Sequence, residues 1–267
     1  MELLLKSFVS VFVGAGILYI LVWCGYFDAA TTEDGYKYYA EMENPDWGFI
    51  QFPKWLKMPA NSVVNAGYTI LGFIWIYIAR VDSTKCLTQM DKYMFYIFSW
   101  KAVVYGPAQY ARIATQAHRW AILDQWYTFP FFAWVTVWGQ YVLHGWNSFR
   151  TAVVMLLSCS SYILTLVHHR GFEVALGIHI LFAVDTAVKV HLKHPVKSNI
   201  IVIICAVLSC AGFVCLKLLD IYLAQYKPFQ YLTGHFWSKV CDTLQIHFVC
   251  KFFHNIYKHR NMDIKRK

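Results

Sequence analysis

Long apolar runs recur along the chain and are separated by short polar segments. A bilayer core about 30 Å thick is crossed by roughly 20 mostly apolar residues in a helix, and eight segments of the sequence meet that requirement. These segments are 3–27, 59–79, 93–116, 122–143, 150–168, 172–190, 199–219 and 235–257. The pattern predicts an all-α, polytopic membrane protein with about eight transmembrane helices.

The segments between the spans predict a single membrane domain over residues 1–267. An amino-terminal helix (3–27) precedes an acidic and aromatic loop (28–58), a seven-helix core (59–257) and a basic tail (258–267). The apolar run from Phe8 to Phe27 is longer than the 7–15 residues typical of a signal-peptide core, so we expect the first helix to be retained.

Composition agrees with the membrane prediction. AVILMFWYC residues make up 58% of the 267 positions, against roughly 45–50% in a soluble domain, and the mean hydropathy is +0.40. The net charge of +9 does not indicate a nucleic-acid partner, because no basic run alternates with aromatic residues. The eight cysteines lie mostly in apolar runs without CxxC spacing, and we interpret them as small buried residues.

Basic residues near the helix ends predict the orientation, since cytoplasmic loops carry the excess of Lys and Arg. Of the 24 Lys and Arg, fourteen lie on the side of the termini, nine lie on the opposite side and Lys101 lies mid-span. We therefore expect both termini to be cytoplasmic. In the absence of a retrieval motif, an endomembrane of the secretory pathway is the default location.

Three predicted spans carry polar residues at helical spacing, and such residues usually face the interior of a bundle. The three sets are Asn61, Asn65 and Tyr68; Gln109, Arg112 and Gln116; and His235, Lys239 and Asp242. Asp124 opens the fourth span at the same end, so the sets could converge on one polar cavity. The alternatives are interhelical hydrogen bonding by the amides and an interfacial position for Arg112. Farther along, Lys217 and Asp220 have the spacing of a local helix pair.

Six strings of the sequence are distinctive: NSVVNAGYTILG (61–72), YGPAQYARI (105–113), LDQWYTFPFFAW (123–134), GFEVALG (171–177), LSCAGFVCLKLLD (208–220) and YLTGHFWSKVCDTLQIHF (231–248). Together they closely resemble the transmembrane protein 187 family. The resemblance covers nearly the whole chain, and the last string is its most specific part. It implies a multi-pass membrane topology.

A more distant resemblance links the seven-helix core to membrane hydrolases of the alkaline ceramidase and adiponectin receptor superfamily. In those enzymes three histidines bind zinc, and a metal-bound water attacks the substrate amide. Asn61 and Asn65 are similar to the N-x-x-x-N of the ceramidases, Asp124 matches the Asp of an LD dipeptide, and His235 matches the first His of an H-x-x-x-H pair.

Three positions depart from that superfamily. Gln109 stands where its Ser would be, while Ile113 and Lys239 stand where two zinc-binding histidines would be. Catalytic zinc needs about three protein ligands, so the comparison implies no metal cofactor, no confident catalytic residue and His235 as a remnant ligand. We expect the Lys239 ammonium to face Asp124 and replace the charge of the ion, with Asp242 as the competing partner.

The leading hypothesis is a pseudoenzyme of the lipid-hydrolase type that binds a membrane lipid in its bundle or a protein partner of unknown identity. One alternative is an active lipid amidase or esterase with a non-standard site. Another is a proton-linked transporter using Asp124, Lys239 and Asp242, although the broken-helix repeats typical of transporters are not evident.

Overall fold

The computed structural model describes residues 2–33, 35–42, 50–53, 55–83 and 85–266, and for residues 261–266 it describes the backbone alone. Within these residues every regular element is a helix, and there is no strand. The predicted loop residues at 34, 43–49 and 54 lie outside the described residues.

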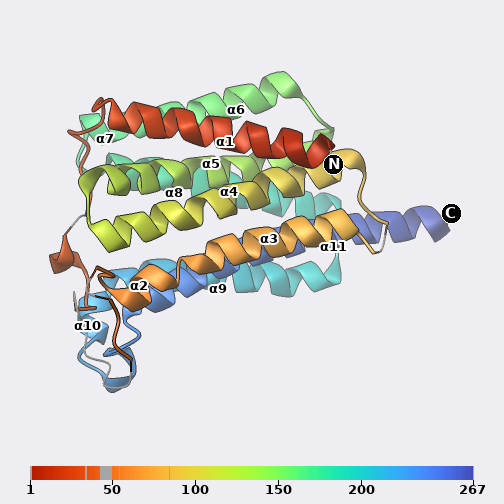
Figure 1. Cartoon of the computed structure of the whole chain (residues 1–267). Helices are drawn as coiled ribbons and strands as arrows, with labels where there is room; N and C mark the ends of the chain where they lie inside the picture. The colour runs from red at the N-terminus through yellow and green to blue at the C-terminus, as the bar shows by residue number, and fades with distance from the viewer. Residues whose placement is uncertain (1, 34, 43–49, 54, 84, 267) are drawn as a thin grey trace.

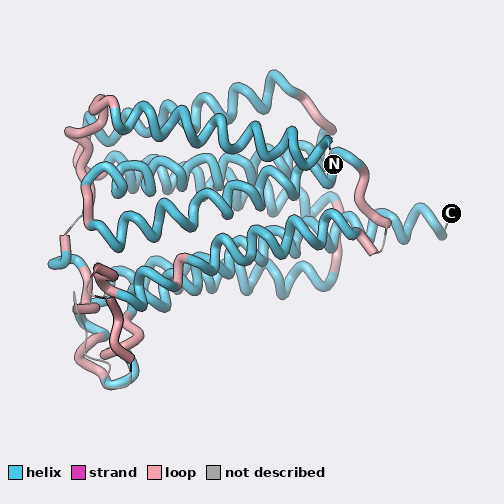
Figure 2. Tube along the Cα trace, in the orientation of Figure 1, coloured by secondary structure: helices cyan, strands magenta, loops and turns pink. Residues whose placement is uncertain are grey.

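Each predicted span coincides with a helix or with consecutive helices (Figures 1 and 2). The long elements are α1 (Glu2–Trp23), α2 (Pro59–Val63) followed by α3 (Ala66–Val81), α4 (Gln89–Thr115), α5 (His118–His144), α6 (Ser148–Ser160) followed by η2 (Ser161–Ile163) and α7 (Leu164–Val167), α8 (Gly171–Lys193), α9 (Lys197–Leu218) and α11 (Gly234–Arg266). Short elements are η1 (Tyr36–Tyr38), α10 (Asp220–Leu223) and η3 (Lys227–Phe229). The last helix extends beyond the boundary predicted at residue 257, because the backbone of the basic tail is also helical as far as Arg266.

Five of these segments are long and apolar enough to cross a membrane. They are Glu2–Trp23, Pro59–Val81, Ser148–Val167, Gly171–Lys193 and Lys197–Leu218. The helices α4, α5 and α11 are not among them, and they contribute many of the buried residues. Since neighbouring helices shield them from lipid, they can carry the polar side chains that lower hydropathy.

The helices run roughly parallel in one bundle (Figure 1). The most extensive packing joins α3 to α4, α5 to α8 and α9 to α11, and α4 also contacts α1 and α5. Glycine allows the close approach of α3 to α4, since a Cβ atom on Gly72 would lie 2.7 Å from the carbonyl oxygen of Ser99. Small residues at such contacts are typical of membrane helices.

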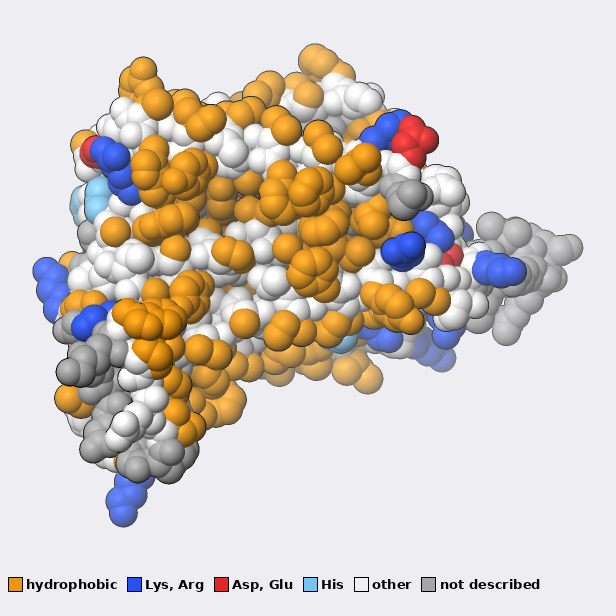
Figure 3. Space-filling model, in the orientation of Figure 1, with side chains coloured by type: hydrophobic (Ala, Val, Ile, Leu, Met, Phe, Trp, Pro, Cys, Tyr) orange, Lys and Arg blue, Asp and Glu red, His pale blue; other side chains and the backbone are white. Residues whose placement is uncertain are grey.

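Apolar side chains cover the middle of the face shown in Figure 3, and the charged side chains visible there lie towards its two ends. Large apolar residues that are exposed on the outer helices include Leu156 on α6, Leu181 on α8 and Leu208 on α9. An apolar belt of this kind suits contact with lipid tails rather than water. Both termini lie at one end of the bundle, and the loop that precedes α2 lies at the other (Figure 1).

At the end that bears the termini, Asp91 fastens three helices together. Its carboxylate caps α4 by accepting hydrogen bonds from the Thr88 backbone and hydroxyl, at 2.8 and 2.7 Å. It also accepts hydrogen bonds from the Tyr141 hydroxyl of α5 and from Arg260 of α11, each at 2.9 Å. The Asp91 side chain is fully buried, so this contact anchors the last turns of α11.

Replacing Asp91 should loosen the end of α11. We expect Asp91→Asn to lower the free energy of unfolding by about 1–3 kcal/mol, because charged hydrogen-bond partners lose their acceptor, and to speed tryptic cleavage at Arg260. Denaturation by SDS and timed proteolysis measure the two effects. The matched control is Asp185→Asn, which removes an exposed pair with Lys189 and should change stability by less than about 1 kcal/mol. Equal effects of the two variants would contradict the anchoring role.

Candidate functional site

The eight predicted site residues lie towards the loop-bearing end of the bundle, on α2, α4, α5 and α11 and at the junction of α2 with α3. Seven are buried, and Asp242 is partly buried. They are Asn61, Asn65, Gln109, Arg112, Asp124, His235, Lys239 and Asp242. We call this set, together with Tyr68, Tyr105 and Thr128, the polar cluster.

Asp124 is the centre of the first part of the cluster. Its two carboxylate oxygens accept hydrogen bonds from different residues of α4, Oδ1 from the Gln109 amide and Oδ2 from the Arg112 guanidinium. Arg112 and Asp124 form a buried ion pair. Arg112 also donates to the backbone oxygen of Glu33 at 3.1 Å, so it joins α4, α5 and the loop.

Asp242 and two tyrosines form the second part. The Tyr68 hydroxyl donates to the Asp242 carboxylate, and the Tyr68 ring meets the Tyr105 ring edge to face at 5.0 Å. The Tyr105 and Thr128 hydroxyls are 3.0 Å apart, and Thr128 donates to the backbone oxygen of Asp124. The two parts are thus connected through α5, whereas the convergence of all three polar stripes on one cavity stays a prediction.

The predicted pairing of Lys239 with Asp124 is wrong. Among the described residues no ion pair joins Lys239 to a carboxylate; its ammonium lies 5.7 Å from the centre of the Phe213 ring. Asp124 forms its ion pair with Arg112 instead. The guanidinium of Arg112 can reach Asp124 because α4 packs directly against α5. Asp242, the competing partner, is bound by Tyr68.

The loop that precedes α2 covers the cluster, and contacts that the sequence did not predict hold it there. The Tyr39 ring meets the His235 ring edge to face at 4.8 Å. Asp220 accepts hydrogen bonds from the backbone nitrogens of Ala40 and His235, at 2.7 and 2.6 Å. Lys217 pairs with Glu33 at 3.0 Å, so the predicted local pair of Lys217 with Asp220 is also wrong.

Glu41 attaches the loop to the start of α2. Its carboxylate oxygens accept hydrogen bonds from the backbone nitrogens of Ala60 and Asn61, both at 2.8 Å, and its side chain is buried. Burial raises the pKa of Glu41 to about 7, and the nearby Asp220 charge adds to the rise, while the two backbone hydrogen bonds oppose it. The partners lie 19 and 20 residues away, so no local spacing signals this contact.

This pKa makes the attachment sensitive to pH. Because the folded-state pKa of about 7 exceeds the ordinary value of 4.5, protonation favours the folded form. The stabilisation is complete below about pH 4.5 and is lost as the pH rises through about 7. We expect the melting temperature in detergent to fall over that interval and Glu41→Gln to flatten the fall. Glu173→Gln, at an exposed position on α8, is the control; an unchanged slope in Glu41→Gln would contradict the assignment.

Several buried polar atoms of the cluster have no hydrogen-bond partner among the described residues. They are both side-chain heteroatoms of Asn61, Oδ1 of Asn65, Oε1 of Gln109, Nε of Arg112 and Nε2 of His235. Buried polar atoms are normally paired. These atoms are therefore available to hydrogen-bond a polar group that enters the cluster.

A zinc ion does not fit this set of residues. No group of three His, Cys, Asp or Glu side chains suitable for a metal occurs in the described part of the chain. His235 is the cluster's imidazole, and both oxygens of Asp124 are taken by Gln109 and Arg112. The ligand set falls short of the roughly three protein ligands of catalytic zinc.

A small pocket lies beside the cluster. It has a volume of about 60 Å³ and is bordered by Tyr68, Tyr105, Thr128 and Asp242. An apolar groove of about 150 Å³ runs between α8 and α9 over α5 and α11. Pocket and groove share four lining residues, which are Phe132, Val135, Gln245 and Val249. The pocket beside the polar cluster therefore adjoins an apolar groove between two of the outer helices.

Comparison with known proteins identifies the family. The TMEM187 protein family matches residues 7–254. The chain belongs to this family. Transmembrane protein 187 of Homo sapiens is 41% identical over 254 residues, which cover 95% of this chain and 94% of the human protein. Transmembrane protein 187 of Bos taurus is 42% identical over 237 residues, which cover 88% of this chain and 91% of the bovine protein.

Membership of the TMEM187 family confirms the first resemblance drawn from the sequence. It agrees with the five apolar helices, and together they establish a multi-pass membrane protein. No solved structure matches the chain.

Proposed function

We propose that this protein is an eight-span membrane protein that binds a lipid with an uncharged polar head group, without zinc-dependent catalysis. The observation that carries the proposal is the set of four residues shared by the groove between α8 and α9 and the pocket beside the polar cluster. An acyl chain in the groove would lie among apolar side chains, and its head group would reach Asp242 and Thr128.

The charges of the cluster favour an uncharged head group. Arg112 and Asp124 neutralise each other, and two other side chains of the cluster, Lys239 and Asp242, carry opposite charges. A charged head group would therefore lack a net opposite charge. The unpaired amide atoms of Asn61 and Gln109 suit hydroxyl or amide groups, which both donate and accept hydrogen bonds.

The absence of zinc catalysis rests on the residues that depart from the membrane hydrolases. Ile113 and Lys239 cannot replace two imidazoles, because one has no donor atom and the other carries a positive charge. Purified protein should therefore hold well under one zinc per chain by elemental analysis. A stoichiometric zinc that is lost in His235→Ala would reject this part of the proposal and favour an active amidase.

The five apolar segments and the three helices α4, α5 and α11 together make eight spans. In this topology α4, α5 and α11 cross the bilayer surrounded by the five apolar segments, which separate them from lipid. The basic residues favour cytoplasmic termini and an endomembrane of the secretory pathway. A glycosylation acceptor engineered within 28–58 should then be modified, and tags at both termini should be accessible after selective permeabilisation of the plasma membrane. An unmodified acceptor in correctly inserted protein would contradict this topology.

Photocrosslinking can test the lipid site. We expect a clickable, photoactivatable ceramide, which has an amide and hydroxyl head, to label peptides of α8, α9 and α11 in the purified full chain. Ala206→Trp, which places a large ring in the groove, should abolish that labelling. Ile204→Trp, on the exposed side of the same helix, is the matched control and should keep it. Equal labelling of the two variants would overturn the proposal.

A further inference from the structure

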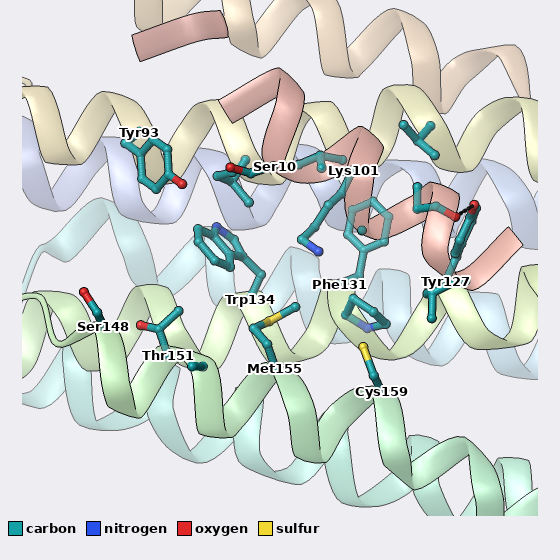
Figure 4. Close-up of a pocket in the computed structure, with 18 of the residues that line it drawn as sticks. Ser10, Tyr93, Lys101, Tyr127, Phe131, Trp134, Ser148, Thr151, Met155 and Cys159 are labelled. Atoms are coloured by element: carbon teal, nitrogen blue, oxygen red, sulfur yellow. Dashed lines mark hydrogen bonds between the residues drawn. The ribbon is translucent and has the colours of Figure 1, made fainter. Parts of the chain in front are cut away.

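A second cavity lies on another side of the bundle, between α1, α4, α5 and α6 (Figure 4). Its volume is about 580 Å³, within the range of roughly 300–1,000 Å³ typical of small-molecule sites. Apolar and aromatic side chains such as Val11, Phe131, Trp134 and Met155 make up most of its wall. No Asp or Glu is among the described residues that line it.

Lys101 brings a positive charge into this cavity. It lies near the middle of α4, and its amine points into the cavity towards Trp134 (Figure 4), with Nζ 6.0 Å from the centre of the ring. In the described part of the chain, no hydrogen bond or ion pair involves the Lys101 amine. A charged group at this depth in a membrane is costly unless it has a partner, so its presence points to a ligand of opposite charge.

The other polar groups on the wall are mostly engaged within the protein. The Ser10 hydroxyl donates to the backbone of Lys6, the Tyr127 hydroxyl to the backbone of Ala15 and the Trp134 indole to the backbone of Met94. Among the described residues that line the cavity, the Lys101 amine is therefore the cation that has no hydrogen-bond or ion-pair partner. Recognition of a polar group at this site would therefore depend on Lys101.

The cavity continues towards the end that bears the termini. A more open groove of about 650 Å³ shares Ser10, Tyr93 and Trp146 with it and extends along α1 to Lys6. Of these three shared residues, Tyr93 and Trp146 present aromatic rings, and Ser10 and the Tyr93 hydroxyl are polar. An extended hydrocarbon chain could thus lie along α1 from the depth of Lys101 to the edge of the bundle.

We propose that this cavity binds a single-chain amphiphile with a carboxylate head, in the chemical class of long-chain fatty acids. The carboxylate pairs with Lys101, and the chain follows the groove along α1. A carboxylate suits the site because one ammonium balances one negative charge, whereas a phosphate dianion would keep an excess. This site differs from the lipid site proposed above in its helices and in the charge of its ligand, and it does not depend on that proposal.

A photoactivatable, clickable palmitic acid analogue tests the site in the purified full chain. We expect saturable labelling of peptides from α1, α4 and α6. Lys101→Met should weaken the apparent affinity by at least about tenfold, as expected for the loss of a charge-assisted hydrogen bond. The matched control is Lys197→Met, which removes an exposed lysine at the start of α9, outside the residues that line the cavity and the groove, and should leave the affinity unchanged.

The methyl ester of the same probe tests the charge without any substitution. It should bind the unaltered protein as weakly as the acid binds Lys101→Met, and this comparison remains decisive even if that variant does not fold. Equal affinity for acid and ester, or labelling that Lys101→Met leaves intact, would overturn the proposal. Labelling of the acid confined to α8 and α9 would overturn it too, without affecting the neutral-lipid site.

Discussion

Arg112→Met and Asp124→Asn should each lower the free energy of unfolding by about 3–5 kcal/mol, and the double variant should recover much of that loss. Each single change leaves a buried group without the partner that it has in the folded protein. Removing both leaves no uncompensated charge, which is why the double change costs less than the sum. Equilibrium unfolding in mixed SDS and detergent micelles measures the four free energies of the cycle.

Lys239→Met provides the control for this cycle. Because Arg112 and not Lys239 contacts Asp124, the effects of Lys239→Met and Asp124→Asn should be much closer to additive than those of the Arg112 cycle. Additive effects of Arg112→Met and Asp124→Asn would contradict the observed pair. Strong coupling through Lys239 would instead restore the pairing first predicted from the sequence.

Gly72→Val should destabilise the protein by about 1–3 kcal/mol or more, because it overfills a closely packed contact. A Cβ atom on Gly72 would lie 2.7 Å from both the Ser99 carbonyl oxygen and a methyl carbon of Val103. The carbonyl belongs to the backbone of α4 and cannot turn away as a flexible side chain can. Relief would require α3 and α4 to move apart along one of the most extensive contacts of the bundle.

Gly177→Val is the matched control for this prediction. Gly177 lies inside α8, and a Cβ atom there would meet nothing within 4 Å. Valine has a somewhat higher helix propensity than glycine, so the control should be neutral or slightly stabilising. A comparable loss in the two variants would show that the close approach of α3 to α4 has little effect on stability, and thermal unfolding in detergent can decide this.

The five apolar segments could be predicted from the sequence because a span in contact with lipid requires a long apolar run. The same reasoning found the polar cluster, since Gln109, Arg112 and His235 interrupt such runs at helical spacing. It could not assign the pairs. Whether Arg112 or Lys239 reaches Asp124 depends on which helices touch and on side-chain reach, and neither property is encoded in spacing along one helix.

The contacts that hold the loop were missed for a related reason. Glu41 and Asp220 are carboxylates outside the long apolar runs, where charged residues are ordinary. Their partners are backbone groups in distant parts of the sequence. No side-chain pattern accompanies a backbone donor, so these contacts become evident only when the loop, α2 and α11 lie together.

The use of backbone donors also determines which substitutions are compatible with the attachment of the loop over the cluster. Glu41 and Asp220 accept hydrogen bonds from the main chain at Ala40, Ala60, Asn61 and His235. Nineteen of the twenty common amino acids supply the same N–H group, and proline alone does not. The donor positions can therefore change identity during divergence while the two acidic acceptors are retained. A comparison of many relatives should find proline absent at these four positions even where the side chains vary.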